Sequence, residues 1–157
     1  MKNDYISEIY EKDKLVLHPY ENFSDRGTYN RKLITKSDNI YLYDENGNKF
    51  IDGPGGMWCN NIGHGNREIG EAVKNQIEKM DYCSPFSEST EISAELASVL
   101  ADLSPGDLNT IFFTSDGSTA NETALRFVMF YNNILGKPNK KHIITRDKAY
   151  HGSTYLT

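Results

Sequence analysis

Apolar residues recur at helical spacing in three long stretches of the chain. The stretches follow Asn66, Thr90 and Ser118, and each ends at residues that do not continue a helix. The third ends at Gly136, a residue type that readily takes the left-handed conformation just beyond a helix. We therefore predict helices over about residues 67–80, 90–103 and 118–135, and a shorter helical stripe over residues 5–10.

Two short runs of β-forming residues flank an Asn-Gly pair. The runs are residues 40–43 and 49–52, and Asn46-Gly47 between them suits a type I′ turn because both residue types tolerate positive φ. Two further apolar runs, 110–114 and 142–145, lie on either side of the third helix. We therefore predict a β-hairpin over residues 39–52 and a right-handed strand–helix–strand crossover from 110 to 145.

Composition and charge exclude several classes of protein. Of the 157 residues, 38% are hydrophobic and 25% are charged, which is ordinary for a globular domain. A net charge of −5 argues against a nucleic-acid partner, whose binding surface would be basic. The chain has no apolar run of roughly 20 residues for a membrane span, and its charged N-terminus is unlike a secretory signal. The two cysteines lie far apart and suit a reducing compartment, so we expect a cytoplasmic protein without nucleic-acid or membrane partners.

Residues 112–121, Phe-Phe-Thr-Ser-Asp-Gly-Ser-Thr-Ala-Asn, carry the clearest chemical signal. An apolar run ends, Gly117 turns the chain, and Ser118 opens a helix. The first N–H groups of a helix lack intrahelical partners and its dipole favours an anion there, while glycine lets a ligand approach the backbone. The pattern predicts a phosphate-binding turn. The alternative is that Asp116 or Ser118 only caps the helix.

Other catalytic and cofactor motifs are missing from the sequence. There is no Gly-Lys-Ser/Thr loop, no complete dinucleotide fingerprint and no Gly-x-Ser-x-Gly elbow. The four histidines, at positions 18, 64, 142 and 151, show no metal-ligand spacing, so we expect no metal site.

Residues 112–126 resemble the phosphate-loop helix of class III aminotransferases, which are pyridoxal-phosphate enzymes of fold type I, the aspartate-aminotransferase-like α/β fold. The resemblance continues in order over residues 15–157. Within that class, the Trp58 segment and His18-Pro19-Tyr20 are most similar to ω-amino-acid or amine:pyruvate aminotransferases. The resemblance implies that residues 1–52, with the hairpin, are part of a small domain. Residues 53–157 would begin the cofactor-binding large domain, truncated after its first strands.

The same resemblance implies roles for individual residues around pyridoxal 5′-phosphate. Gly117 and Ser118 would bind the phosphate, Tyr150 would stack on the pyridine ring, and His151 would shape the pocket. A turn histidine with only local hydrogen bonds is the alternative for His151. The family usually has Ser-Gly-Ser-Glu-Ala where this chain has residues 116–120, so Asp116 brings a carboxylate near the expected phosphate.

Trp58 and Phe86 would line the substrate pocket, although a buried aromatic without a binding role is the alternative for Trp58. The Schiff-base lysine and the pyridine-pairing aspartate lie well downstream of the Tyr-His-Gly motif in the family, and no lysine of this chain matches. We therefore assign no catalytic residue here.

The sequence thus predicts the N-terminal portion of a homodimeric enzyme that transfers an amino group from an amine or ω-amino acid to a pyruvate-like keto acid. This portion is expected to be inactive alone. The alternatives are another class III enzyme (an aminomutase, a decarboxylase, or a diamino-acid or biotin-pathway aminotransferase) and a non-catalytic remnant that binds a phosphorylated ligand.

Overall fold

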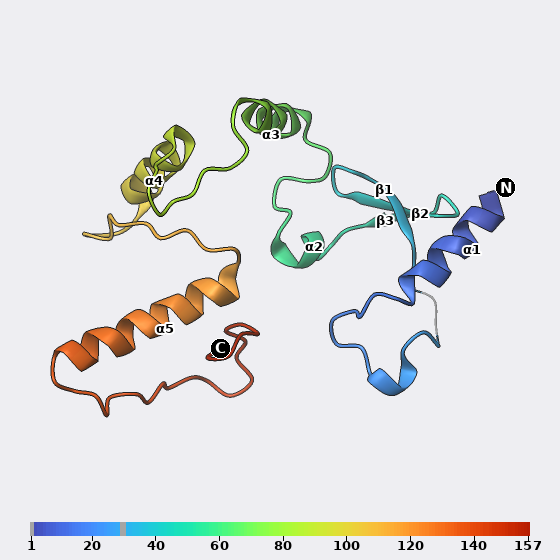
Figure 1. Cartoon of the computed structure of the whole chain (residues 1–157). Helices are drawn as coiled ribbons and strands as arrows, with labels where there is room; N and C mark the ends of the chain where they lie inside the picture. The colour runs from blue at the N-terminus through green and yellow to red at the C-terminus, as the bar shows by residue number, and fades with distance from the viewer. Residues whose placement is uncertain (1, 29–30) are drawn as a thin grey trace. The chain divides into compact units, whose positions relative to one another are not determined.

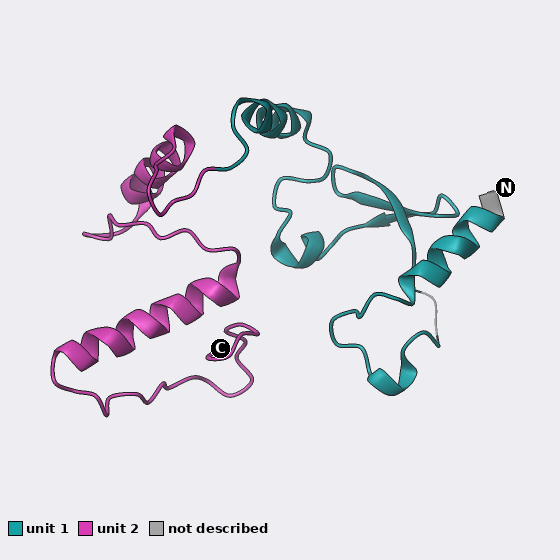
Figure 2. Ribbon diagram, in the orientation of Figure 1, with its two compact units in different colours: residues 1–82 teal, residues 83–157 magenta. Residues whose placement is uncertain are grey.

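The computed structural model describes residues 2–28 and 31–157, which divide into two compact units, Met1–Tyr82 and Cys83–Thr157 (Figures 1 and 2). The first unit contains helices α1 (Lys2–Asp13), α2 (Gly55–Trp58) and α3 (Arg67–Lys79), a 3-10 turn η1 (Phe23–Asp25), and strands β1 (Ile34–Asp38), β2 (Tyr41–Asp44) and β3 (Lys49–Ile51). The second unit contains helices α4 (Glu91–Leu103) and α5 (Gly117–Ile134). The domain boundary predicted at 52/53 stays a prediction.

The three long helices are confirmed, and side-chain caps fix where each begins. Asn66 accepts a hydrogen bond from the Ile69 N–H at the start of α3, and Thr90 accepts one from the Ser93 N–H at the start of α4. These caps satisfy backbone donors that have no partner within the helix. The stripe predicted over residues 5–10 lies within α1.

A three-stranded antiparallel sheet, in the order β1-β2-β3, dominates the first unit. The predicted hairpin is confirmed as β2 and β3, in which Leu42 lies opposite Phe50. The sequence pattern did not predict β1. Its residues, Ile-Thr-Lys-Ser-Asp, lack the alternation of apolar and polar residues that marks a half-buried strand, and all five side chains are exposed.

The type I′ turn predicted for the hairpin is wrong. Gly47 has a φ of 84°, but Asn46 does not share the positive φ that a type I′ turn requires. Instead, the Asp44 carboxylate accepts hydrogen bonds from the N–H groups of Asn46 and Asn48, at 3.0 and 2.8 Å. The Asp44 side chain therefore closes the loop in place of the second left-handed residue.

The strands predicted at 110–114 and 142–145 are absent, and the predicted crossover between them is wrong. Neither segment has a sheet partner within the part of the chain that the structure describes. The first segment still lies against α5, since the rings of Phe112 and Phe127 pack edge to face with centroids 6.1 Å apart. A β-forming composition gives only a propensity, and a strand also needs a neighbour to pair with its backbone.

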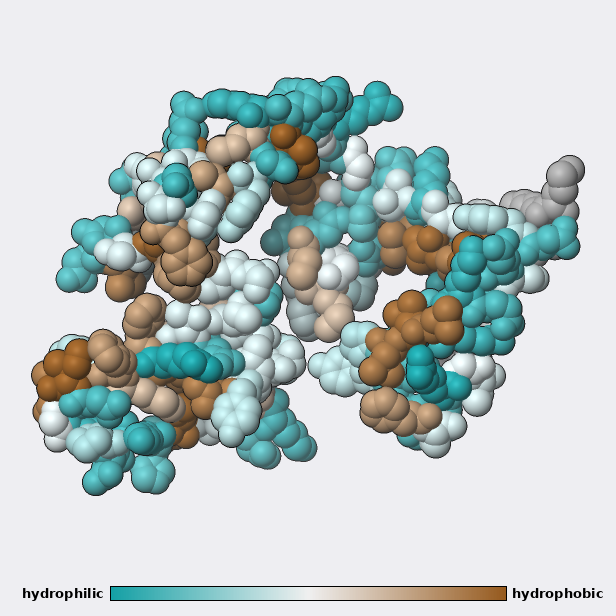
Figure 3. Space-filling view, viewed as in Figure 1, coloured by the Kyte–Doolittle hydropathy of each residue, from teal (hydrophilic) through white to brown (hydrophobic). Residues whose placement is uncertain are grey.

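Apolar burial is missing from the described residues: only Asp44 and Asn132 are buried, each 6% exposed. Apolar side chains of both units lie on the visible surface (Figure 3, brown). None of the helices described here is long and apolar enough to cross a membrane. The local structure of this chain therefore depends on caps, turns and hydrogen bonds.

Candidate functional site

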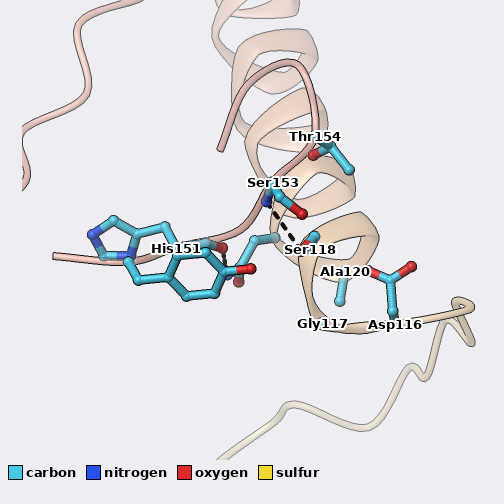
Figure 4. A pocket seen from close by; sticks show the side chains of 9 residues that line it. Asp116, Gly117, Ser118, Ala120, His151, Ser153 and Thr154 are labelled. Carbon is cyan, nitrogen blue, oxygen red and sulfur yellow. Dashed lines mark hydrogen bonds between the residues drawn. The ribbon is translucent and has the colours of Figure 1, made fainter. Parts of the chain in front are cut away.

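The start of α5 and the segment that follows Ala149 together line an open pocket of about 700 Å³ (Figure 4). The helix contributes Gly117 and Ser118, and the segment contributes Tyr150 and His151. The structure thus places in one pocket all four residues that the sequence predicted for cofactor binding, although the two pairs are more than 30 positions apart.

Three side chains on one face of α5 hold the second segment against the helix. The Ser153 N–H donates to Ser118 Oγ at 3.2 Å, and Asn121 Nδ2 donates to the His151 carbonyl oxygen at 2.6 Å (Figure 4 draws the Ser153 bond). Thr154 and Tyr155 also lie near the Glu122 carboxylate, where they lower its pKa. We call residues 150–155 the docked segment.

Sequence reasoning missed the roles of Asn121 and Glu122. Their spacing from Ser118, three and four positions, puts all three on one helix face. That spacing was the available signal, but it did not show which segment of the chain the face would contact.

The beginning of α5 offers donors to an anion. Ser118 Oγ accepts from Ser153, so the hydroxyl proton of Ser118 is left to donate elsewhere. A Cβ added at Gly117 would meet no atom within 4 Å, so the backbone there is open to an approaching ligand. The residues present therefore fit a phosphate group at the N-terminus of this helix.

Asp116 caps α5, as the alternative interpretation of the motif predicted. Its carboxylate accepts from the Thr119 N–H at 2.9 Å, and Thr119 Oγ1 accepts from the Asp116 N–H at 3.2 Å. The hydrogen bond from the Thr119 N–H is the main cause that lowers the pKa of Asp116. This charged cap lines the same pocket, so its negative charge disfavours an anion at this helix end.

Tyr150 and His151, the two residues of the docked segment that were predicted to bind the cofactor, differ in how their side chains are engaged. Tyr150 is 71% exposed, so its ring can accept a flat partner. His151 Nε2 lies 2.6 Å from Thr145 Oγ1, which is the local hydrogen bonding that the alternative for this residue predicted.

Trp58 and Phe86 belong to different units and do not line this pocket. Trp58 ends α2 and is 78% exposed, so the residues described here do not bury it. Phe86 precedes α4 and is also exposed. Across residues 2–28 and 31–157, no three His, Cys, Asp or Glu side chains are grouped to hold a metal ion.

Gly152 is expected to be essential for the contact between the docked segment and α5. It has a φ of 154°, and an added Cβ would lie 3.0 Å from Ser118 Cβ and would overlap Thr157. In the protein from the complete reading frame that contains these residues, Gly152→Ala should speed hydrogen exchange of the Ser153 amide at least about tenfold. Gly70→Ala, at a helical glycine with no atom within 4 Å, is the control. Equal exchange in the two variants would contradict the expectation.

The docked segment is also expected to detach in acid. The hydrogen bond from Thr154, followed by that from Arg126, lowers the pKa of Glu122 below its ordinary value of 4.5. A carboxylate with a lowered pKa stabilises the docked state above that ordinary value, and the stabilisation is lost as pH falls through the lowered pKa.

Tyr155 resonances followed by NMR should therefore report an acid transition below pH 4.5. Glu122→Gln should remove this transition, whereas the transition of Asp116, the other carboxylate at this helix end with a lowered pKa, should remain. A Tyr155 transition with the same midpoint in Glu122→Gln would contradict the assignment.

A helix N-terminus open to an anion, beside an exposed aromatic ring, defines a site for a flat phosphorylated ligand. The family model for class III aminotransferases matches residues 23–157, and the chain belongs to this family. The family's cofactor is pyridoxal phosphate, and its fold is the fold type I that the sequence predicted.

Three relatives illustrate the similarity. A putrescine–pyruvate aminotransferase from Pseudomonas aeruginosa is 37% identical over 139 residues, which are 88% of this chain and 30% of that protein. An omega transaminase from Pseudomonas jessenii, solved in complex with PMP, superposes with a TM-score of 0.86 at 36% identity, over 92% of this chain and 32% of that one.

The third is a thermostable omega transaminase with a tryptophan-to-glycine substitution, engineered for asymmetric synthesis of enantiopure bulky amines. It superposes with a TM-score of 0.88 at 35% identity, over 93% of this chain and 33% of that one. The chain thus spans about a third of the length of the relatives it matches.

Proposed function

We propose that these 157 residues form the part of a class III aminotransferase that binds the phosphate end of pyridoxal phosphate. The whole enzyme would transfer an amino group from an amine or ω-amino acid to a pyruvate-like keto acid. The observation that carries this proposal is that Gly117, Ser118, Tyr150 and His151 line one and the same pocket. The activity for which the putrescine–pyruvate relative is named supports the substrate class.

When bound, pyridoxal phosphate supplies the electron sink for amino-group transfer. The residues of this chain would orient it. The backbone at Gly117 and the hydroxyl of Ser118 would donate to the phosphate, and the Tyr150 ring would pack on the pyridine face. Asn121 and Glu122 would hold the docked segment so that this ring keeps its position relative to the phosphate.

Trp58 and Phe86 are proposed to line the substrate pocket. Both rings are exposed, so both are available for contact with a substrate. The engineered neighbour, in which a tryptophan was replaced by glycine for bulky amines, supports a size-limiting tryptophan in this family. Trp58 is the single tryptophan of this chain.

The proton transfers of the reaction are proposed to need residues outside these 157. Lys137, Lys140, Lys141 and Lys148 lie between α5 and the docked segment, away from the position at which the family carries its Schiff-base lysine. We therefore propose that these residues alone do not catalyse turnover. A cytoplasmic homodimer is the proposed state of the whole enzyme.

The test compares the 157-residue chain with the protein from the complete reading frame, both with intact mass verified. The ligand is deoxypyridoxine phosphate, which lacks the aldehyde and so reports binding of the phosphate and ring alone. We expect both proteins to bind it, and the protein from the complete reading frame to form alanine from putrescine and pyruvate. Alanine formation by the 157-residue chain would overturn the proposal. Failure of both proteins to bind the ligand would also overturn it.

A further inference from the structure

Residues 55–58 form one turn of left-handed helix, within α2. Gly55, Gly56, Met57 and Trp58 have φ values of 56°, 58°, 57° and 67°, and ψ is 44° at Gly56 and 50° at Met57. Glycine adopts this conformation freely, but in Met57 and Trp58 the Cβ crowds the following carbonyl oxygen. Residues held in such backbone regions persist only where their surroundings enforce them, and they cluster at functional sites.

Burial of the turn does not explain this strain. The side chains of Met57 and Trp58 are 62% and 78% exposed, so neither is held by packing. The contacts that the structure shows around the turn are hydrogen bonds.

Asp52 supplies these contacts on the side where the chain enters the turn. Its carbonyl oxygen accepts from the Gly55 N–H at 3.2 Å, and its Oδ1 accepts from the Gly56 N–H at 3.3 Å. The Asp52 side chain is only 9% exposed. One residue thus binds the first two N–H groups of the left-handed turn.

His64 ties Asp52 to the other end of the loop. Its Nε2 lies 2.9 Å from Asp52 Oδ2, and its Nδ1 accepts from Asn60 Nδ2 at 2.7 Å. Its backbone exchanges two hydrogen bonds with Asn39, between β1 and β2, at 3.0 and 2.7 Å. The hydrogen bond with His64 is the main cause that lowers the pKa of Asp52. Gly63 packs closely here, since a Cβ added to it would lie 2.7 Å from Asn39 Oδ1.

We propose that Asp52 and His64 are positioning residues that hold the left-handed turn so that Trp58 meets the substrate in one fixed orientation. The inference rests on the proposed function for the part of Trp58 in substrate recognition. It adds that amine selectivity depends on a polar pair that does not itself contact the substrate.

The test uses the protein from the complete reading frame and the variants Asp52→Asn, His64→Gln and Asn60→Ala. Asp38→Asn, the same change at an exposed carboxylate of β1, is the matched control. Near-ultraviolet circular dichroism reports on the tryptophans. Trp58→Phe, measured in parallel, identifies the part of the signal that comes from Trp58.

We expect Asp52→Asn and His64→Gln to halve the Trp58 signal or more, with far-ultraviolet dichroism unchanged. The ratio of kcat/KM for phenylethylamine to that for putrescine should change about fivefold or more, with kcat for putrescine within about twofold of the wild type. Asn60→Ala, which removes one bond to His64 without changing charge, should shift both readouts in the same direction by less.

The outcomes separate the two proposals. An unchanged Trp58 signal in active Asp52→Asn and His64→Gln proteins would overturn this inference and leave the proposed function standing. A lost signal with an unchanged substrate ratio would overturn the link to selectivity. If the wild type transaminates no amine, the proposed function fails and the role in selectivity fails with it. If Asp52→Asn or His64→Gln unfolds, the substrate ratio of Asn60→Ala decides. An altered ratio supports the inference, and an unchanged ratio overturns it.

Discussion

Gly117→Val is expected to lower the affinity for deoxypyridoxine phosphate by roughly 10- to 100-fold, the range that follows from losing one charge-assisted hydrogen bond. The valine side chain would stand where the phosphate approaches the backbone at the start of α5. It should not disturb the fold of the docked segment, because the space around Gly117 is open for 4 Å. The affinity is measured by titrating the ligand into the protein from the complete reading frame.

Gly70→Val is the matched control for this prediction. Gly70 also lies in a helix, α3, and an added Cβ there would meet no atom within 4 Å. Both variants place the same side chain on a helix where an added Cβ meets no atom, so a difference between them reports the loss of the binding site. Equal affinities would mean that the helix end of α5 does not bind the phosphate.

The local parts of this fold were predictable because two independent sequence signals mark each of them. Helix α3 is marked both by the Asn66 cap and by its apolar spacing, and the hairpin is marked both by its β-forming runs and by Gly47. The turn type was mispredicted because composition alone does not reveal that the Asp44 carboxylate closes the loop. Segments 110–114 and 142–145 were mispredicted because pairing depends on a neighbouring strand, which no local pattern reports.

The site was predictable to a different degree at each of its residues. Gly117 and Ser118 stand out from the sequence because a glycine before a helix start has a physical meaning for anions. Tyr150 and His151 came only from the family resemblance, since nothing local connects them to α5. The roles of Asn121 and Glu122 required the structure, because a polar helix face is ordinarily solvated and only the docked segment gives it a partner.

The left-handed turn at 55–58 could not be predicted from its own residues. Glycines at 55 and 56 permit it, but Met57 and Trp58 oppose it. What enforces it is the pairing of Asp52 with His64, twelve positions apart. Local propensity and tertiary contact disagree at this turn, and such disagreement is itself a signal of function.

The 157-residue chain on its own is expected to lose its structure gradually in urea, without one sharp transition. No apolar side chain within residues 2–28 and 31–157 is buried, so the roughly 1.5–3 kcal/mol that each buried Leu, Ile or Phe contributes is not gained. Helices α3 and α4, of 13 residues each, are marginal without such packing. Helix content followed by circular dichroism should therefore fall with an apparent m-value well below about 1 kcal/mol per molar urea.

A substitution inside an apolar stripe distinguishes this expectation from that for a protein with a formed core. Leu96 lies on α4 and is 48% exposed. Leu96→Ala should therefore change the apparent free energy of unfolding obtained from the urea profile by less than about 0.5 kcal/mol. A leucine in a packed core would cost about 2–5 kcal/mol when replaced by alanine. The exposed apolar surface should also bind anilinonaphthalene sulfonate strongly. A single steep transition that Leu96→Ala shifts by the larger amount would show that the chain buries this helix face, and with it an apolar core, by itself.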